Sequence, residues 1–191
     1  RSQVLKSSIF WFAFPGLLGL PAFGTVLFFQ QVNYASLKGW DHLSMVKAYP
    51  LFTMVAVGIS FLVGSLIDRY SAIKLIGFYQ IPAILGFYIF SICETLIGFS
   101  IGVIFFAITA GSNNIIPNAF WAECFGTSSL GRIKSLVAGV MVVGSALGPL
   151  TSGFLIDLDF DLNLQYKLFA AYFVFSSILL IMATRKASTA V

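Results

Sequence analysis

The stretch GSLIDRYSAIKL, residues 64–75, is a short charged island between two long apolar runs. Its charged residues are Asp68, Arg69 and Lys74. No charged residue lies between Lys47 and Asp68, or between Lys74 and Glu94. About 20 consecutive apolar residues are enough to cross the hydrocarbon core of a bilayer as a helix. The island is therefore predicted to connect two membrane-spanning helices at one membrane surface.

The composition of the whole chain agrees with this setting. Of 191 residues, 59% are hydrophobic and only 9% are charged, whereas soluble domains carry about 25% charged residues. Because the connections are short, the spans are expected to be helices, which satisfy their own backbone hydrogen bonds in lipid. The sequence predicts an all-α membrane protein with six transmembrane helices, over 9–32, 48–67, 74–92, 96–118, 135–156 and 166–184.

The positions of Lys and Arg predict the orientation. If the chain starts in the cytoplasm, eight of the 11 basic residues face the cytoplasm and three face outward. The positive-inside rule therefore places both termini and the 64–75 island in the cytoplasm, and we expect an integral multi-pass protein of the plasma (inner) membrane. No basic helix or stripe suits a nucleic-acid partner.

Two five-residue segments indicate an internal repeat. Residues 64–68 are GSLID and residues 153–157 are GFLID, an offset of 89. The same offset carries the starts of the first three predicted spans close to the starts of the last three. Since three is an odd number of crossings, the second triplet would run in the opposite sense, an inverted-topology repeat. The predicted repeats are 1–93 and 94–191; the alternative is a chance match among common apolar residues.

The island resembles the loop signature of the major facilitator superfamily, roughly Gly-x-Leu-Ala-Asp-Arg-x-Gly-Arg-Arg. Gly64, Leu66, Asp68 and Arg69 match it, while Ser71, Ala72 and Ile73 stand where glycine and basic residues are usual. The opening QVLKSSIFW and the segments AECFG, GRIKSL and GSALGPLTSGFLID are similar to the seventh, tenth and eleventh helices of that superfamily. Within it, the resemblance is nearest to monocarboxylate and oxalate–formate carriers.

This resemblance implies that the chain is the C-terminal six-helix half of a twelve-helix carrier. An N-terminal six-helix half, membrane lipids and a small solute would then be its partners. The expected function is secondary active transport by alternating access, with a monocarboxylate or other organic anion as one class of solute. A half-size carrier acting as a dimer and a membrane scaffold that transports nothing are the alternatives.

Two sets of residues are predicted to serve gating and helix packing. Gly64 would allow close approach of helix ends, Asp68 would accept hydrogen bonds from a neighbouring helix N-terminus, and Arg69 and Lys74 would bind acidic partners or lipid phosphates; together these four residues form the predicted gating loop. Small residues recur every four positions on two spans, a spacing that favours close packing in lipid, and Pro149 favours a bend. The packing or hinge set is Ala56, Ser60, Gly144, Gly148, Pro149 and Ser152.

Polar residues inside apolar runs are candidates for a solute pathway. Asn113 and Asn114 interrupt the fourth span, and Thr25 interrupts the first at a similar depth. An unpaired amide in lipid costs several kcal/mol, so at least one asparagine should face water, solute or another helix. Gln30, Gln31 and Tyr34 end the first span, and Gln80 is expected to bond a carbonyl that Pro82 leaves free.

Other kinds of chemistry have little support in the sequence. Charged residues and histidine are missing from the interiors of the predicted spans, so an acid/base pair for a membrane enzyme is not expected. Cys93 and Cys124 are predicted at opposite membrane faces, and His42 is the single histidine. We therefore expect no metal site, no cofactor and no enzymatic activity. The absence of buried charge also favours a neutral or amphipathic solute, unless the other half supplies the charge.

Overall fold

The computed structural model describes residues 7–188. Within this range the chain is helical and contains no strand, which confirms the all-α prediction. The elements are α2 (Ser8–Phe29), α3 (Gln31–Lys38), α4 (His42–Val46), α5 (Tyr49–Tyr70), α6 (Ala72–Leu75), α7 (Ile81–Ile92), α8 (Leu96–Asn113), α9 (Ile116–Phe125), the 3₁₀ turn η1 (Thr127–Ser129), α10 (Leu130–Asp157) and α11 (Leu162–Ser188).

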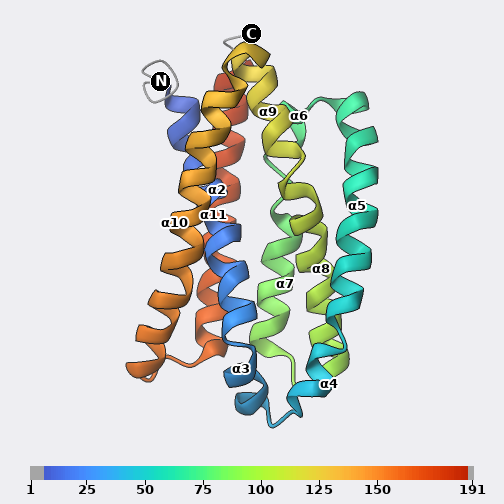
Figure 1. Ribbon diagram of the computed structural model, residues 1–191, viewed down its shortest axis with the longest axis vertical. Coiled ribbons are helices and arrows are strands. Elements are labelled where there is room, and N and C mark those ends of the chain that lie inside the picture. The colour runs from blue at the N-terminus through green and yellow to red at the C-terminus, as the bar shows by residue number, and fades with distance from the viewer. Residues whose placement is uncertain (1–6, 189–191) are drawn as a thin grey trace.

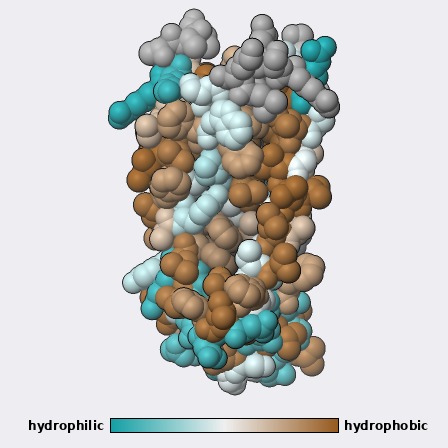
Figure 2. Space-filling model, turned by 90° about the vertical axis from the view of Figure 1, so that its left-hand side faces the viewer, coloured by the Kyte–Doolittle hydropathy of each residue, from teal (hydrophilic) through white to brown (hydrophobic). Residues whose placement is uncertain are grey.

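Five helical segments are long and apolar enough to cross a membrane, which indicates a membrane protein. They are Ser8–Phe29, His42–Tyr70, Leu96–Phe125, Leu130–Asp157 and Leu162–Ala187. Figure 1 shows them running lengthwise beside one another, with the start of α2 and the end of α11 at the same end of the bundle. In Figure 2, which shows the side on which α10 lies, apolar residues dominate the middle and hydrophilic residues gather toward the two ends.

The long helices pack as two groups joined at the centre. In one group, α2 packs against both α10 and α11. In the other, α8 packs against both α5 and α7, and the contact between α7 and α11 joins the groups. As a result, α5 and α10 lie on the flanks, where few of their side chains are buried.

The predicted single helix over 74–92 is wrong. The structure has the short helix α6, a turn over 76–80, and then α7, which has Pro82 at its second position. A proline in a helix interior has no amide hydrogen for the carbonyl four residues earlier, and its ring clashes with that carbonyl. A new helix therefore begins at Ile81, so Pro82 sits in the first turn, where no intrahelical donor is needed.

The predicted helix over 96–118 is also interrupted, and it extends further than expected. Helix α8 ends at Asn113, Asn114 and Ile115 form a turn, and α9 continues to Phe125. Pro117 is the cause, because it has no amide hydrogen to bond the carbonyl of Asn113. The break places two adjacent asparagines in irregular backbone between two apolar helices.

Two clusters of buried side chains form the core, one toward each end of the bundle. The cluster nearer α3, here called the aromatic cluster, is rich in aromatic residues, among them Tyr34, Phe87, Phe90 and Tyr166. At this end Lys38 pairs with Glu94 at 2.9 Å. Asp41 caps α4 by accepting hydrogen bonds from the Ser44 hydroxyl and amide, and these bonds lower the pKa of its carboxyl. The second cluster joins the start of α2, α9 and the end of α11.

Candidate functional site: a groove between α2 and α8

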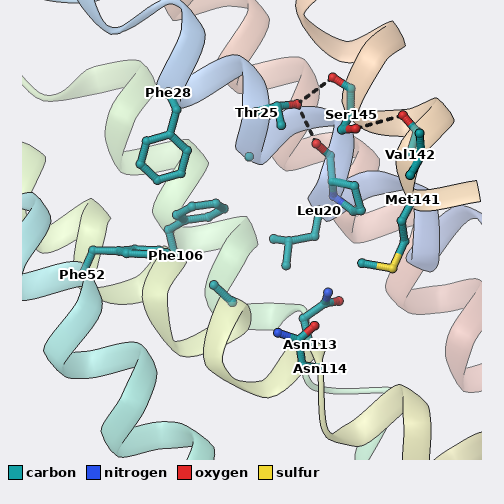
Figure 3. A pocket seen from close by; sticks show the side chains of 13 residues that line it. Leu20, Thr25, Phe28, Phe52, Phe106, Asn113, Asn114, Met141, Val142 and Ser145 are labelled. Carbon is teal, nitrogen blue, oxygen red and sulfur yellow. Dashed lines mark hydrogen bonds between the residues drawn. The ribbon is translucent and has the colours of Figure 1, made fainter. Parts of the chain in front are cut away.

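A groove of about 430 Å³ opens between α2 and α8, with α5 and α10 at its sides. Figure 3 shows Phe28, Phe52 and Phe106 on one side and Met141 on the other. Asn113 and Asn114 lie at one end, and Thr25 and Ser145 lie toward the other. The complete lining is Leu20, Pro21, Gly24, Thr25, Phe28, Phe52, Phe106, Ala110, Asn113, Asn114, Met141, Val142 and Ser145.

The groove is an apolar trough with polar groups at its ends. None of the described residues that line it is charged. Such a surface suits a solute with an apolar body and few polar atoms, because each buried polar atom needs a hydrogen-bond partner. A fully charged solute would need a counter-charge from outside this set of residues.

The structure brings three residues of the predicted solute pathway to this groove: Asn113, Asn114 and Thr25. Asn113 is half-buried at the end of α8, and Asn114 is exposed in the turn that follows. The Asn118 side chain donates to the Asn114 carbonyl, so this irregular backbone is partly satisfied from within. Non-helical backbone at membrane depth is tolerated where protein covers it or where it lines a wet cavity.

Two hydroxyl groups at the other end of the groove have their protons directed at backbone carbonyls. Thr25 Oγ1 lies 2.6 Å from the Pro21 carbonyl oxygen, 2.8 Å from that of Ala22 and 3.3 Å from that of Ser145. Ser145 Oγ donates to the Val142 carbonyl at 2.8 Å. The Ser145 carbonyl lacks its usual helical donor because the residue four positions later is Pro149. Thr25 thus joins α2 to α10 at the proline, and neither hydroxyl proton points to a solute.

Small residues of the predicted packing set lie where these helices approach each other most closely. A Cβ added to Gly148 on α10 would overlap the Ala22 carbonyl of α2. A Cβ added to Gly111 on α8 would overlap the Ala56 carbonyl of α5 in the same way. Ser60 Oγ donates to the Gly111 carbonyl at 3.0 Å across the second contact. Gly144 is buried against Leu18, and Ser152 donates to Gln165 Oε1 at 2.6 Å.

The other three predicted pathway residues are not in the groove. Gln30 accepts a hydrogen bond from Asn33, and Gln31 accepts one from the Tyr49 hydroxyl. Tyr34 is fully buried in the aromatic cluster, where its hydroxyl donates to the Phe90 carbonyl at 2.5 Å. All three stabilise the end of the bundle near α3.

The predicted gating loop differs from the structure in two respects. An added Cβ at Gly64 would meet nothing within 4 Å, so this glycine does not serve a close approach. Glu123 of α9, rather than Asp68, accepts hydrogen bonds from a helix start: the amides of Ala72 and Ile73 at 2.9 and 3.0 Å, and the Ser71 hydroxyl at 2.6 Å. Asp68, Arg69 and Lys74 are exposed.

Helix packing explains why Glu123 rather than Asp68 has this role, since both carboxylates are exposed. Helix α9 packs beside α6 and brings Glu123 to the amides at its start. The spacing of 64–75 alone could not reveal a partner 50 residues away in the chain.

Sequence reasoning named Gln80 with the wrong partner, and it missed the other buried polar groups behind the groove, Tyr79 and Ser176. Gln80 bonds the Gly16 carbonyl of α2, not a carbonyl freed by Pro82. Tyr79 donates to Asn113, and Ser176 of α11 donates to Gln80. A glutamine within an apolar run was the available signal, since a buried amide must find partners.

Comparisons with models of protein families, with curated proteins and with solved structures give no match to this chain.

Proposed function

We propose that this chain is the C-terminal six-helix half of a secondary transporter of the major facilitator type, which moves a small solute by alternating access. The observation that carries the proposal is the groove between α2 and α8. These helices hold equivalent places in the two predicted repeats, and the uncharged groove ends at the broken helix with Asn113 and Asn114.

The packing of the helices supports the inverted repeat. Exchanging α2 with α8, α5 with α10 and α7 with α11 converts the contact of α2 with α10 into that of α8 with α5, and the contact of α2 with α11 into that of α8 with α7. The α7–α11 contact is converted into itself. The offset of 89 residues also relates Ala22 to Gly111, the two positions at which the flanking helices approach most closely. In this proposal the α6–α7 segment is the sixth crossing.

Exposed apolar side chains on the flanking helices α5 and α10 are consistent with contact with a partner half or with lipid. Met54 and Phe61 of α5 and Leu150 and Phe154 of α10 are each more than 60% exposed. Large apolar side chains exposed in such numbers indicate contact with lipid or with another protein surface. An N-terminal half placed against α5 and α10 would close the open side of the groove.

The transport test uses the full-length protein in vesicles preloaded with unlabelled solute, so that counterflow of a labelled probe needs no coupling ion. The probes are lactate, oxalate and glycerol, which represent a monocarboxylate, a dicarboxylate and an uncharged solute. We expect counterflow of at least one probe. Asn113→Leu should lower it about tenfold, because one hydrogen bond to the solute is worth about 1 kcal/mol and the leucine leaves polar partners unpaired.

The matched control is Asn33→Leu, which removes an exposed asparagine outside the groove. It should leave counterflow unchanged. Equal losses in both variants, with normal membrane insertion, would count against the groove as the pathway. A scaffold would show no counterflow above that of empty vesicles.

The proposed orientation can be tested by labelling single cysteines. Among the described residues, Arg69, Lys74, Arg132, Lys134, Arg185 and Lys186 lie toward the end where α2 begins, against Lys38, Lys47 and Lys167 at the other end. With Cys93 and Cys124 replaced by serine, a membrane-impermeant maleimide should label Leu43→Cys in intact cells but label Lys74→Cys only after permeabilisation. The opposite pattern would reverse the topology.

A further inference from the structure

A chain of hydrogen bonds runs through the protein interior to the groove. Ser176 Oγ donates to Gln80 Oε1 at 2.6 Å, and Gln80 Nε2 donates to the Gly16 carbonyl at 2.6 Å. Gln80 Nε2 also lies 3.0 Å from the Tyr79 hydroxyl oxygen, which in turn lies 3.2 Å from Asn113 Oδ1. Gln80 and Ser176 are fully buried, and Tyr79 is only 6% exposed. The chain thus links α11, α2 and the α6–α7 turn to the end of α8.

The direction of every bond in this chain follows from one backbone group. The Gly16 carbonyl can only accept, so the Gln80 amide must turn its nitrogen toward it. The same nitrogen donates its second hydrogen to the Tyr79 hydroxyl, which leaves Gln80 Oε1 to accept from Ser176. Because Tyr79 accepts from Gln80, its own proton is available for Asn113. The Asn113 atom that can accept this proton is the oxygen, and the oxygen is the atom that faces Tyr79 in the structure.

This order fixes which part of Asn113 is left for a solute. Asn113 lines the groove, and none of the described residues accepts a hydrogen bond from its Nδ2. The hydroxyls of Thr25 and Ser145 point their protons at backbone carbonyls, as described above. Asn113 Nδ2 is consequently the donor in the groove whose orientation the protein interior sets.

We propose that the groove binds its solute through a hydrogen-bond acceptor oxygen, such as a ketone, carboxylate or ether oxygen, that accepts from Asn113 Nδ2. The apolar part of the solute would pack against Leu20, Phe106 and Met141. Tyr79, Gln80 and Ser176 act as positioning residues, because they hold the Asn113 amide in one of its two orientations. This inference rests on the proposed function in taking the groove to be the solute site.

The test measures equilibrium binding to the full-length protein in lipid nanodiscs by titration. Three probes have an aromatic ring and differ in their polar atoms: acetophenone only accepts, indole only donates, and benzoate accepts and carries a charge. We expect acetophenone or benzoate to bind at least about tenfold more tightly than indole, since the indole N–H would leave the Asn113 donor unpaired. Tighter binding of acetophenone than of benzoate would identify the preferred acceptor as a neutral oxygen, and the reverse order would identify it as a carboxylate.

The positioning role is tested with two tyrosine variants. Tyr79→Phe should weaken binding of the acceptor probe about fivefold, because the Asn113 amide can then rotate. Tyr172→Phe is the matched control: it also removes a tyrosine hydroxyl that donates a hydrogen bond, in this case to the Pro15 carbonyl of α2 at 2.8 Å, but this hydroxyl does not contact Asn113. The affinity of Tyr172→Phe for the acceptor probe should be unchanged. In an Asn113→Leu background, Tyr79→Phe should cause no further loss, since the two residues act through one contact.

Three results would overturn the inference. They are indole binding as tightly as the acceptor probes, equal effects of Tyr79→Phe and Tyr172→Phe, and no binding of either acetophenone or benzoate. These results are separable from failure of the transport proposal. A protein that binds acceptors without counterflow would refute transport alone, whereas counterflow of a solute that only donates would refute the acceptor site alone.

Discussion

Replacing Gly148 by alanine is expected to destabilise the protein by about 3 kcal/mol, although alanine is the better helix former. The added Cβ would overlap the Ala22 carbonyl, which is backbone and cannot rotate away. Helices α2 and α10 would have to separate, and the contact of Thr25 with the Ser145 carbonyl at 3.3 Å would be lost with them. In lipid, where close packing drives helix association, such a separation removes the main stabilising interaction.

The measurement is the thermal unfolding midpoint of the full-length protein in detergent. Gly153→Ala is the control on the same helix: an added Cβ there meets nothing within 4 Å. It should leave the midpoint unchanged or raise it slightly, since alanine favours the helix by about 1 kcal/mol. Equal midpoints for Gly148→Ala and Gly153→Ala would show that α2 and α10 do not pack as described.

The same pair of substitutions can be made at the equivalent contact between α5 and α8. Gly111→Ala would place its Cβ against the Ala56 carbonyl, whereas Gly58→Ala on α5 would meet nothing. We expect Gly111→Ala to lower the thermal unfolding midpoint and Gly58→Ala to leave it unchanged or raise it slightly. If only one contact responds, the two triplets of helices do not share one packing scheme.

Replacing Glu123 by alanine is expected to cost about 2 kcal/mol and to release the start of α6. The carboxylate accepts three hydrogen bonds, from the Ser71 hydroxyl and from the amides of Ala72 and Ile73. Those amides belong to the first turn of a helix and have no partner within it. Ser71 also holds a positive φ of 71°, a conformation that a serine adopts only with local support.

Hydrogen exchange detected by mass spectrometry should locate this effect. A peptide covering 71–75 should exchange faster in Glu123→Ala than in the unmodified protein. Asp68→Ala is the control, because the helix start is capped by Glu123 and not by Asp68, so the loss of Asp68 should leave that peptide unchanged. Faster exchange in Asp68→Ala, with none in Glu123→Ala, would return the capping role to the aspartate.

The helices themselves could be predicted from the sequence because lipid imposes a simple condition. A backbone segment without water must bond to itself, so long uncharged runs such as 48–67 are predicted as helices, and α5 covers this run from Tyr49 onward. Composition also excluded a soluble core. The interruptions of the helices were harder to predict, because Pro82 and Pro117 are compatible with either a kink or a break. Which of the two forms depends on the neighbouring helices that satisfy the freed groups.

The candidate site was predictable only in part, for a similar reason. Asn113, Asn114 and Thr25 stand out in sequence because polar side chains are costly in apolar runs, and the structure places all three at the groove. Tyr34 is also a polar residue at the end of an apolar run, yet its hydroxyl donates to the Phe90 carbonyl in the core. Polarity in a sequence shows that a partner is needed, but it does not distinguish a solute from a backbone carbonyl.

The sequence by itself determined that this protein is a bundle of long apolar helices with short charged connections, because the hydrophobic effect and backbone hydrogen bonding act on local composition. Only the tertiary structure decided that Glu123 rather than Asp68 caps α6, and that Asn113 turns its oxygen toward Tyr79. Both results depend on bonds between residues more than 30 positions apart. Donor and acceptor become paired only when the helices have packed, so no local pattern encodes them.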